Sequence, residues 1–394
     1  MTKIETLLKT LCPNGVTCYK LNELFDQFSG MTGVTNKWAD NGNCHFVDYM
    51  NAYTHISIDV ADLPYATVKN LNQNTVMQGD ILFTSASETP DECAVSSVIE
   101  VEIQEGIFLD DHLFGLRIKS EYKSKINPSF LKYAFRARTF RFQMKKAVRG
   151  VTRFYVSKPD FMKLTIPVPP LAAQGEIVRI LDNFTELTAE LTAELTARKK
   201  QYEFYRNHLL SFDDDVPRVK LGDNINVLRG KRLTKKQLSD NGKFPVYHGG
   251  LDPLGFFSEK NREANSVMII NVGASAGTVG FSPVEFWSSD GCYCLGKSPV
   301  FSSKFLYHVL KLQEANLRSR VRVAGIPTLD ASAVQQVSIP IIPLPEQECI
   351  VKILDHFDAL CNDISMGLPA EIAARQRQYE HYRDELLNFE KVAL

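Results

Sequence analysis

The sequence predicts an α+β protein in which two mixed α/β domains are separated by two long helices of coiled-coil type. Three observations predict this fold class. One stretch of the chain recurs after about 173 residues. Each copy continues with apolar residues at helical spacing. The segments before the copies contain short strand-like runs broken by Gly, Asn, Asp and Ser, which is typical of mixed domains rather than of doubly wound sheets.

The internal repeat is recognisable at both of its ends. Residues 166–174, IPVPPLAAQ, return at 339–347 as IPIIPLPEQ. The QYEFYR motif near the end of the first copy returns as QYEHYR, and both copies then close with Leu-Leu-x-Phe. The repeat therefore divides the chain into four segments, which are a first domain at 1–165, a first long helix at 166–212, a second domain at 213–338 and a second long helix at 339–394.

Each copy has the pattern of a long amphipathic helix. A proline-rich lead-in cannot continue a helix, so Leu171 and Leu344 are expected to open the two helices. A helix from residue 171 to about 212 would be roughly 60 Å long, and it would not be stable alone, so we expect the two helices to pack on each other. Pro369, which follows Gly367 closely, is expected to kink or restart the second helix.

The packing faces follow from the three- and four-residue spacing of apolar side chains. A seam between two copies of the chain, or a simple tail, is the alternative that this pattern leaves open. The residues predicted to form the packing faces are Leu181, Phe184, Leu191, Leu195, Tyr202, Tyr205 and Leu209 in the first helix, and Leu354, Phe357, Ile364, Ile372, Tyr379, Tyr382 and Leu386 in the second.

A four-residue unit is duplicated inside the first helix, where residues 188–191 and 192–195 both read TAEL. Four residues make close to one helical turn, so one unit more or less changes the helix length by about 6 Å and nearly keeps its face in register. If the helices are spacers, this segment is where their length is adjusted. Neutral slippage in a solvated helix is the alternative interpretation.

Clusters of cations without intervening acids indicate contacts with nucleic-acid phosphates, and Arg can also read guanine. The first domain has such a run from Lys123 to Lys158, although the aromatic spacing within 132–146 fits an ordinary helix face equally well. The second domain has another run from Arg229 to Lys236. The candidate DNA-binding residues are Lys37, Trp38, Arg149, Thr152, Arg153, Arg229, Lys231, Arg232, Lys235, Lys236, Arg320 and Arg322.

Composition sets outer limits on the class of protein. The 394 residues are 44% hydrophobic, which suffices for two or three packed domains. The net charge of −1 argues mildly against binding to nucleic acid. The distribution of the charges along the chain is therefore more informative than their sum. Eight scattered cysteines without a CxxC pair, no bilayer-length apolar run and no evident signal peptide predict a cytoplasmic chain without a disulfide framework or a metal site.

One motif indicates catalysis and has to be weighed. Residues 291–298, GCYCLGKS, match the phosphate-loop pattern GxxxxGK[ST]. The interior Cys-Tyr-Cys-Leu has the pattern of a strand, however, and Pro299 follows at once where a helix would have to open. The glycine-rich run at 271–280 is predicted to be a β-hairpin turn rather than a nucleotide or S-adenosylmethionine loop. We therefore expect no catalytic residues in this chain.

The duplicated IPxxPLxxQ segment, the long helix ending in QYExYRxxLLxF and the TAEL repeat together resemble the specificity subunit of type I restriction–modification enzymes. The resemblance covers the whole chain. It implies two target-recognition domains separated by two antiparallel helices in a pseudo-two-fold arrangement. Each domain would read one half of a split, asymmetric site on double-stranded DNA, and the helices would set the spacer between the halves.

The resemblance also implies partners and cofactors. The helices would dock two modification subunits, which bind S-adenosylmethionine and methylate adenine. Two restriction subunits, motor–nucleases that use ATP and magnesium, would complete the enzyme, and this chain itself would bind no cofactor. Two alternatives from other classes stay open, namely a scaffold protein without sequence-specific DNA contact and a nucleotide hydrolase that uses residues 291–298.

Overall fold

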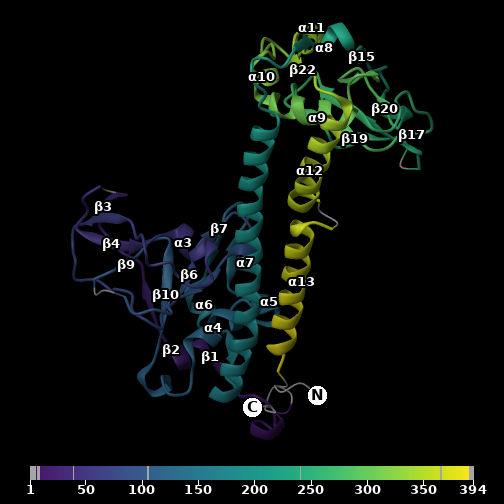
Figure 1. The fold of residues 1–394 in the computed structure, drawn as a ribbon. Helices are drawn as coiled ribbons and strands as arrows, with labels where there is room; N and C mark the ends of the chain where they lie inside the picture. The colour runs from purple at the N-terminus through teal and green to yellow at the C-terminus, as the bar shows by residue number, and fades with distance from the viewer. Residues whose placement is uncertain are drawn as a thin grey trace. The chain divides into compact units, whose positions relative to one another are not determined.

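The computed structural model describes residues 6, 9–38, 40–103, 106–239, 241–363 and 366–389. The chain forms two compact units, of which unit 1 comprises Met1–Glu190 with Ala373–Leu394 and unit 2 comprises Leu191–Ile372. Each unit contains one α/β domain and parts of the long helices (Figure 1). No helix in the described part of the chain combines the length and the apolar character that crossing a bilayer requires.

The domain of unit 1 is built on a four-stranded antiparallel sheet in the order β2-β10-β6-β8. A second four-stranded sheet, β3-β5-β4-β9, and two smaller sheets, β11-β12-β7 and β1-β13, complete it. The strands are β1 (Cys18–Lys20), β2 (Phe25–Ser29), β3 (Val34–Lys37), β4 (Cys44–Val47), β5 (Tyr65–Val68), β6 (Ile81–Thr84), β7 (Ala86–Ser87), β8 (Ser96–Val98), β9 (Phe108–Leu109), β10 (Leu113–Ile118), β11 (Val148–Gly150), β12 (Phe154–Val156) and β13 (Thr165–Pro167). The helices are α2 (Leu21–Leu24), α3 (Tyr49–Thr54), α4 (Pro128–Ala134), α5 (Arg138–Met144) and α6 (Lys158–Phe161), with 3₁₀ turns at Pro90–Glu92 and Ser120–Tyr122.

The core of this domain lies where the main sheet meets α4, α5 and α6. All four residues of β6 are buried, as the strand-like run in the sequence predicts. Phe83 stacks on Phe114 of the neighbouring strand at 5.3 Å between ring centroids and meets Phe135 edge-on at 5.0 Å. Fully buried aromatic side chains of this size contribute much of the hydrophobic stabilisation of a domain, so the sheet is a rigid base for the loops at its ends.

The domain of unit 2 repeats this plan. Its main sheet has the order β15-β21-β18-β19, and the smaller sheets are β17-β16-β20 and β14-β22. The strands are β14 (Arg218–Lys220), β15 (Val227–Arg229), β16 (Phe244–Tyr247), β17 (Gly255–Phe257), β18 (Ser266–Ile270), β19 (Val279–Ser282), β20 (Trp287–Ser288), β21 (Cys292–Leu295) and β22 (Ser338–Pro340). The helices are α8 (Leu221–Asn224), α9 (Ser303–Leu312), α10 (Glu314–Ser319) and α11 (Ala331–Gln335), with a 3₁₀ turn at Lys235–Gln237.

Equivalent backbone contacts show that the two domains share one fold despite their different sequences. The two-stranded sheet that closes each domain pairs Tyr19 with Ile166 in unit 1 and Val219 with Ile339 in unit 2. Directly after β2 and β15, a Cβ atom on Gly30 or Gly230 would lie within about 2 Å of a carbonyl oxygen, so both positions require glycine. The predicted α+β fold class with an internal repeat is therefore confirmed.

The long helices begin where the sequence predicts. Helix α7 (Leu171–Leu209) has 39 residues, which corresponds to about 58 Å, and its segments on either side of Glu190 belong to different units. The second copy is split into α12 (Leu344–Asn362) and α13 (Leu368–Leu386). Helix α13 restarts with Pro369 in its first turn, where a missing N–H costs no hydrogen bond. A Cβ on Gly367 would lie 2.5 Å from the carbonyl oxygen of Ala359, so glycine is required at the interruption.

The predicted packing of one helix on the other is found within each unit. In unit 1, α7 and α13 run side by side in opposite directions (Figure 1). Phe184 stacks on Tyr382 across them at 5.3 Å between ring centroids. In unit 2, Tyr205 stacks on Phe357 of α12 at 5.4 Å. The side chains that join the hydrophobic cores are Leu181, Tyr379 and Leu386 in unit 1 and Leu195, Tyr202, Leu209, Leu354 and Phe357 in unit 2. Leu191 and Ile372 are half-buried and belong to neither core, and Ile364 lies outside the described residues.

The last residue of the duplicated IPxxPLxxQ segment explains why that segment is repeated. Gln174 is fully buried; its Oε1 accepts from the N–H of Asn127, and its Nε2 donates to the carbonyl oxygens of Lys125 and Pro169. Gln347 makes the same three bonds, to the N–H of Ser302 and to the carbonyl oxygens of Val300 and Ile342. One glutamine in each copy thus ties the start of a long helix to its domain.

Candidate nucleic-acid interface

Each domain has a cleft at the same place in its fold, at the end of the central strand β6 or β18. The two positions are equivalent because the residue directly after each strand makes the same kind of backbone hydrogen bond. The N–H of Ser85 donates to His112 O at 2.9 Å in unit 1, and the N–H of Asn271 donates to Gly291 O at 3.1 Å in unit 2. The cleft of unit 1 has a volume of about 890 Å³ and that of unit 2 about 600 Å³. Both clefts are therefore large enough to admit part of a macromolecular ligand.

The linings of these two clefts differ in chemistry. The cleft of unit 1 is lined by Tyr49, Tyr53, Ala86, Ser87, Glu88, Glu92, His112, Thr152 and Arg153. The cleft of unit 2 is lined by Arg229, Arg232, Leu233, Thr234, Lys235, His248, Leu254, Asn271, Val272, Asp290, Gly291 and Thr328. One backbone framework thus presents two different sets of side chains.

A β-hairpin stands beside each cleft and carries several of the predicted contact residues. In unit 1 this hairpin is β11–β12, with Arg149 opposite Tyr155 and with Thr152 and Arg153 exposed in its turn. The corresponding bridge in unit 2 pairs Arg322 with Thr328. The structure therefore brings Thr152 and Arg153 to a cleft, whereas Arg322 belongs to the hairpin of the other cleft.

Two of the predicted arginines are held by carboxylates at the base of these hairpins. Arg149 forms an ion pair of 2.7 Å with Asp160, and Arg322 forms one of 3.0 Å with Asp330. Arg320, near Arg322, donates to the side-chain oxygen of Asn316 and to the carbonyl oxygen of Ala333. All three side chains remain exposed, so an incoming anion would compete with partners that are already in place.

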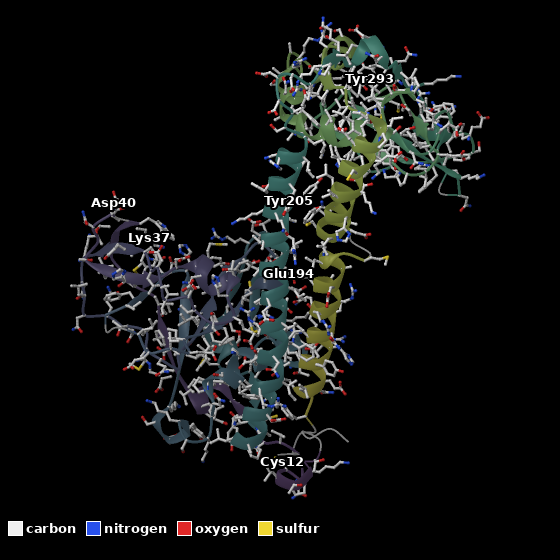
Figure 2. The ribbon with its side chains drawn as sticks, in the orientation of Figure 1. Cys12, Lys37, Asp40, Glu194, Tyr205 and Tyr293 are labelled. Atoms are coloured by element: carbon white, nitrogen blue, oxygen red, sulfur yellow. The ribbon has the colours of Figure 1, made fainter. Side chains whose placement is uncertain are left out.

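Lys37 lies in unit 1, at the end of the domain that is remote from α7 (Figure 2), and Trp38 follows it directly in the chain. The Lys37 ammonium contacts Asp111 and lies 3.1 Å from Asp110, a carboxylate that is only 5% exposed and needs a cation close by. Trp38, in contrast, is 63% exposed and adopts a φ of 61°. Of this predicted pair, Trp38 is the side chain that is open to a partner.

The cation run of unit 2 is the most open of the predicted clusters. Arg229 ends β15, and Lys231 and Arg232 follow Gly230 at the edge of the sheet. Lys235 and Lys236 belong to the next 3₁₀ turn. All five side chains are exposed, and within the described residues none of them forms an ion pair with a carboxylate. Three of the five, Arg229, Arg232 and Lys235, line the cleft.

The long cation run of unit 1 proves to be largely intramolecular. Lys132 is buried and pairs with Glu100 and Asp182 at 3.0 and 2.8 Å. Arg136 and Arg141 donate to main-chain carbonyls, and burial lowers the pKa of both guanidinium groups. The sequence pattern left a DNA-binding face and an ordinary helix face equally open for 132–146, and these contacts favour the ordinary face.

Several cleft residues had no recognisable signal in the sequence. Tyr49 and Tyr53 stack at 5.9 Å, and the Tyr53 hydroxyl donates to Glu92 at 3.1 Å. In unit 2, Asn271 is buried and its Oδ1 has no hydrogen-bond partner among the described residues, while Gly291 donates its N–H to His248 Nδ1. The sequence offered one usable hint to these residues. Polar residues directly follow the buried strands β6 and β18, and residues at the ends of buried strands often line clefts.

The phosphate-loop match at 291–298 has a structural explanation. Its Cys-Tyr-Cys-Leu interior is the buried strand β21, as predicted, and it pairs with β15 on one side and β18 on the other. The N–H of Gly296 donates to Asn226 O at 2.9 Å. A phosphate loop needs free amides in a flexible turn, and these amides belong to a sheet. The run at 271–280 forms the turn between the antiparallel strands β18 and β19, also as predicted.

The fold and the clefts define a class of protein that presents two different binding surfaces on two copies of one domain. A family model for the type I restriction modification DNA specificity domain matches residues 13–198 and 213–374. The chain therefore belongs to this family, and its role is that of a DNA sequence-specificity subunit. The predicted resemblance is confirmed.

Individual relatives agree with this assignment. A Haemophilus influenzae protein that bears the name of a type I restriction enzyme specificity subunit is 35% identical over 263 residues, which are 61% of this chain and 68% of the relative. A type I restriction enzyme specificity subunit of Escherichia coli is 34% identical over 267 residues, 61% of this chain and 66% of the relative. The S subunit structure from M. genitalium shares the fold, with a TM-score of 0.63 at 18% identity over 94% of this chain and 96% of that one.

Proposed function

We propose that this chain reads a bipartite, asymmetric site on double-stranded DNA, with one half-site bound by each domain. The observation that carries the proposal is the pair of clefts, which occupy equivalent backbone positions but have different linings. Sequence is read by side chains that reach base edges, so equal frames with unequal side chains suit two different half-sites. The exposed Trp38, Thr152, Arg153, Arg229, Lys231, Arg232, Lys235 and Lys236 are the candidate contacts, and Arg149, Arg320 and Arg322 would join after exchanging their present partners.

We further propose that the long helices set the spacer between the half-sites and dock the partner subunits. Helix α7 leaves Phe204 65% exposed, and that ring stacks on His208 along the same helix at 6.1 Å. Exposed aromatic side chains are typical of protein interfaces. A solved chain with a TM-score of 0.59, 18% identity and 95% coverage of this chain comes from work on complex assembly of the type I restriction–modification system.

The proposed partners are two modification subunits, which would bring S-adenosylmethionine and methylate adenine, and two restriction subunits, which would bring ATP and magnesium. In this scheme the chain supplies recognition and the partners supply chemistry. Support comes from residues 292–295, the interior of the phosphate-loop match, which form a strand paired on both sides instead of the flexible turn that cradles a nucleotide phosphate.

A methylation map tests the proposal directly. The chain would be co-expressed with a candidate modification subunit from the same source, and modified adenines would be located across the host genome. We expect one split motif with a gap of constant length. A stable complex that adds no methylation would overturn sequence-specific reading and leave the scaffold alternative. Exchanging residues 1–165 for the first domain of a relative should alter one half of the motif and leave the other half unchanged.

A further inference from the structure

The two clefts differ in net charge although their backbones correspond. The cleft of unit 2 is lined by three cations, Arg229, Arg232 and Lys235, and by one carboxylate, Asp290. The cleft of unit 1 is lined by two carboxylates, Glu88 and Glu92, and by one cation, Arg153. A DNA phosphate would therefore be attracted to the cleft of unit 2 and repelled by the cleft of unit 1.

The negative charge in unit 1 is held in place by hydrogen bonds. The Glu92 carboxylate accepts from the hydroxyls of Thr89 at 2.7 Å, Tyr53 at 3.1 Å and Ser87 at 3.2 Å. These bonds, that of Thr89 foremost, lower the pKa of Glu92, so it stays ionised at neutral pH. Glu88 beside it is exposed. An ionised carboxylate accepts hydrogen bonds from base amino groups such as that of cytosine, and it does not bind phosphate.

Two of the three cations that line the cleft of unit 2, Arg229 and Arg232, enter at one equivalent point of the chain. After β2, Met31 donates its N–H to Leu109 O; after β15, Lys231 donates its N–H to Ser288 O. The backbone takes the same path, but the residues on it are Ser-Gly-Met-Thr in unit 1 and Arg-Gly-Lys-Arg in unit 2. Met31 is buried, whereas Lys231 is exposed. Three cations therefore enter unit 2 at positions where unit 1 has none.

We propose that the two domains divide their labour: the cleft of unit 2 anchors DNA backbone phosphates in addition to reading its half-site, whereas the cleft of unit 1 contacts base edges and binds no phosphate. The inference rests on the proposed function. Arg229, Arg232 and Lys235 are the anchoring residues, and Lys231 and Lys236 extend the same surface. Most of the salt dependence of DNA binding then originates in one half of the chain, while sequence discrimination is carried by both halves.

The test is the salt dependence of binding. The assembled complex with modification subunits would be titrated with a duplex containing the mapped site and with a duplex lacking it, between 50 and 200 mM salt, concentrations over which phosphate contacts are clearly resolved. Each neutralised phosphate contributes a slope of about 0.9 in log K against log [salt]. We expect the triple variant R229Q/R232Q/K235Q to lose a slope of about 2.7, so that the unmodified complex weakens roughly 40-fold more than the variant over this range.

Matched single variants provide the control. Arg232→Gln should lower the slope by about 0.9, whereas Arg153→Gln in the other cleft should weaken specific binding without changing the slope. The division of labour alone would be overturned if the complex binds its site specifically but the triple variant leaves the salt slope unchanged. It would also be overturned if Arg153→Gln lowers that slope as much as Arg232→Gln does. An unmodified complex that does not distinguish the two duplexes would instead overturn the proposed function.

Discussion

Tyr133 and His308 occupy the same position in the two domains, and each binds an aspartate at the same position of the duplicated helix. The Tyr133 hydroxyl donates to Asp182 at 2.5 Å, and His308 Nε2 lies 2.8 Å from Asp355 Oδ1. A lysine joins each pair, since Lys132 lies 2.8 Å from Asp182 and Lys304 lies 3.2 Å from Asp355. The repeated aspartate therefore attaches each domain to its helix, and only the attachment in unit 2 contains a histidine.

This difference predicts a pH dependence of stability in unit 2. Burial lowers the pKa of His308 below its ordinary value, and Lys304 lowers it further. Asp355 and Asp358 raise the pKa, but they offset the effect of burial only in part. A histidine whose folded-state pKa is depressed contributes stability above the unfolded value of about 6.5, and this contribution is lost as the pH falls through the folded-state pKa. We expect the protection factors of α9 amides in hydrogen exchange, which are corrected for the intrinsic pH dependence of exchange, to fall below about pH 6.5 while those of α4 in unit 1 change less.

The control for this prediction is His308→Gln, which keeps a donor near Asp355 but does not titrate. The variant should lose the fall in protection that is specific to α9. An unchanged acid response in the variant would show that another group is responsible.

Replacing the buried glutamine of either repeat should loosen a helix start. Gln347→Ala removes the partners of the Ser302 N–H and of two carbonyl oxygens, and unsatisfied buried groups cost about 1–3 kcal/mol each. We expect unit 2 to be destabilised by about 2–4 kcal/mol in denaturant unfolding that is followed at α12. Gln336→Ala, at an exposed position of unit 2, is the matched control and should change little.

Shortening the first helix should change the spacer and not the bases. Deleting residues 188–191 removes one turn of α7, or about 6 Å, and leaves both clefts untouched. We expect the methylated motif to keep its two half-sites and to show a shorter gap between them. Altered half-site bases would rule out the spacer role of this helix, and insertion of one further TAEL unit should lengthen the gap.

Removing the lysine of the phosphate-loop match should have no effect on nucleotide-dependent activity. Lys297 is exposed and follows a strand whose amides are paired in the sheet. Lys297→Ala is therefore expected to leave the ATP-dependent activity of the assembled complex within twofold of the unmodified complex. The prediction would be contradicted if the isolated chain binds nucleotide and this binding is lost in Lys297→Ala. The hydrolase alternative would then be favoured.

Local pattern was sufficient for much of the architecture. The 3.6-residue spacing predicted α7, and the proline-rich lead-in placed its start at Leu171, because both signals act within a few turns of helix. The Cys-Tyr-Cys-Leu run was predicted as a strand for the same local reason. The internal repeat further predicted two domains, each followed by a long helix.

The sequence by itself thus determined the repeat, the long helices and the family. All three are recognised from the spacing of residues that are close together in the chain. Only the tertiary structure decided which cations are free. Lys37 pairs with Asp110, a residue far along the chain, whereas in the part of the chain that the structure describes neither Arg229 nor Arg232 pairs with a carboxylate. It also decided where Glu92 and Asn271 line clefts. The physical reason is that ion pairing and cleft formation depend on distances in space, which the folded sheets determine between residues that are remote in sequence.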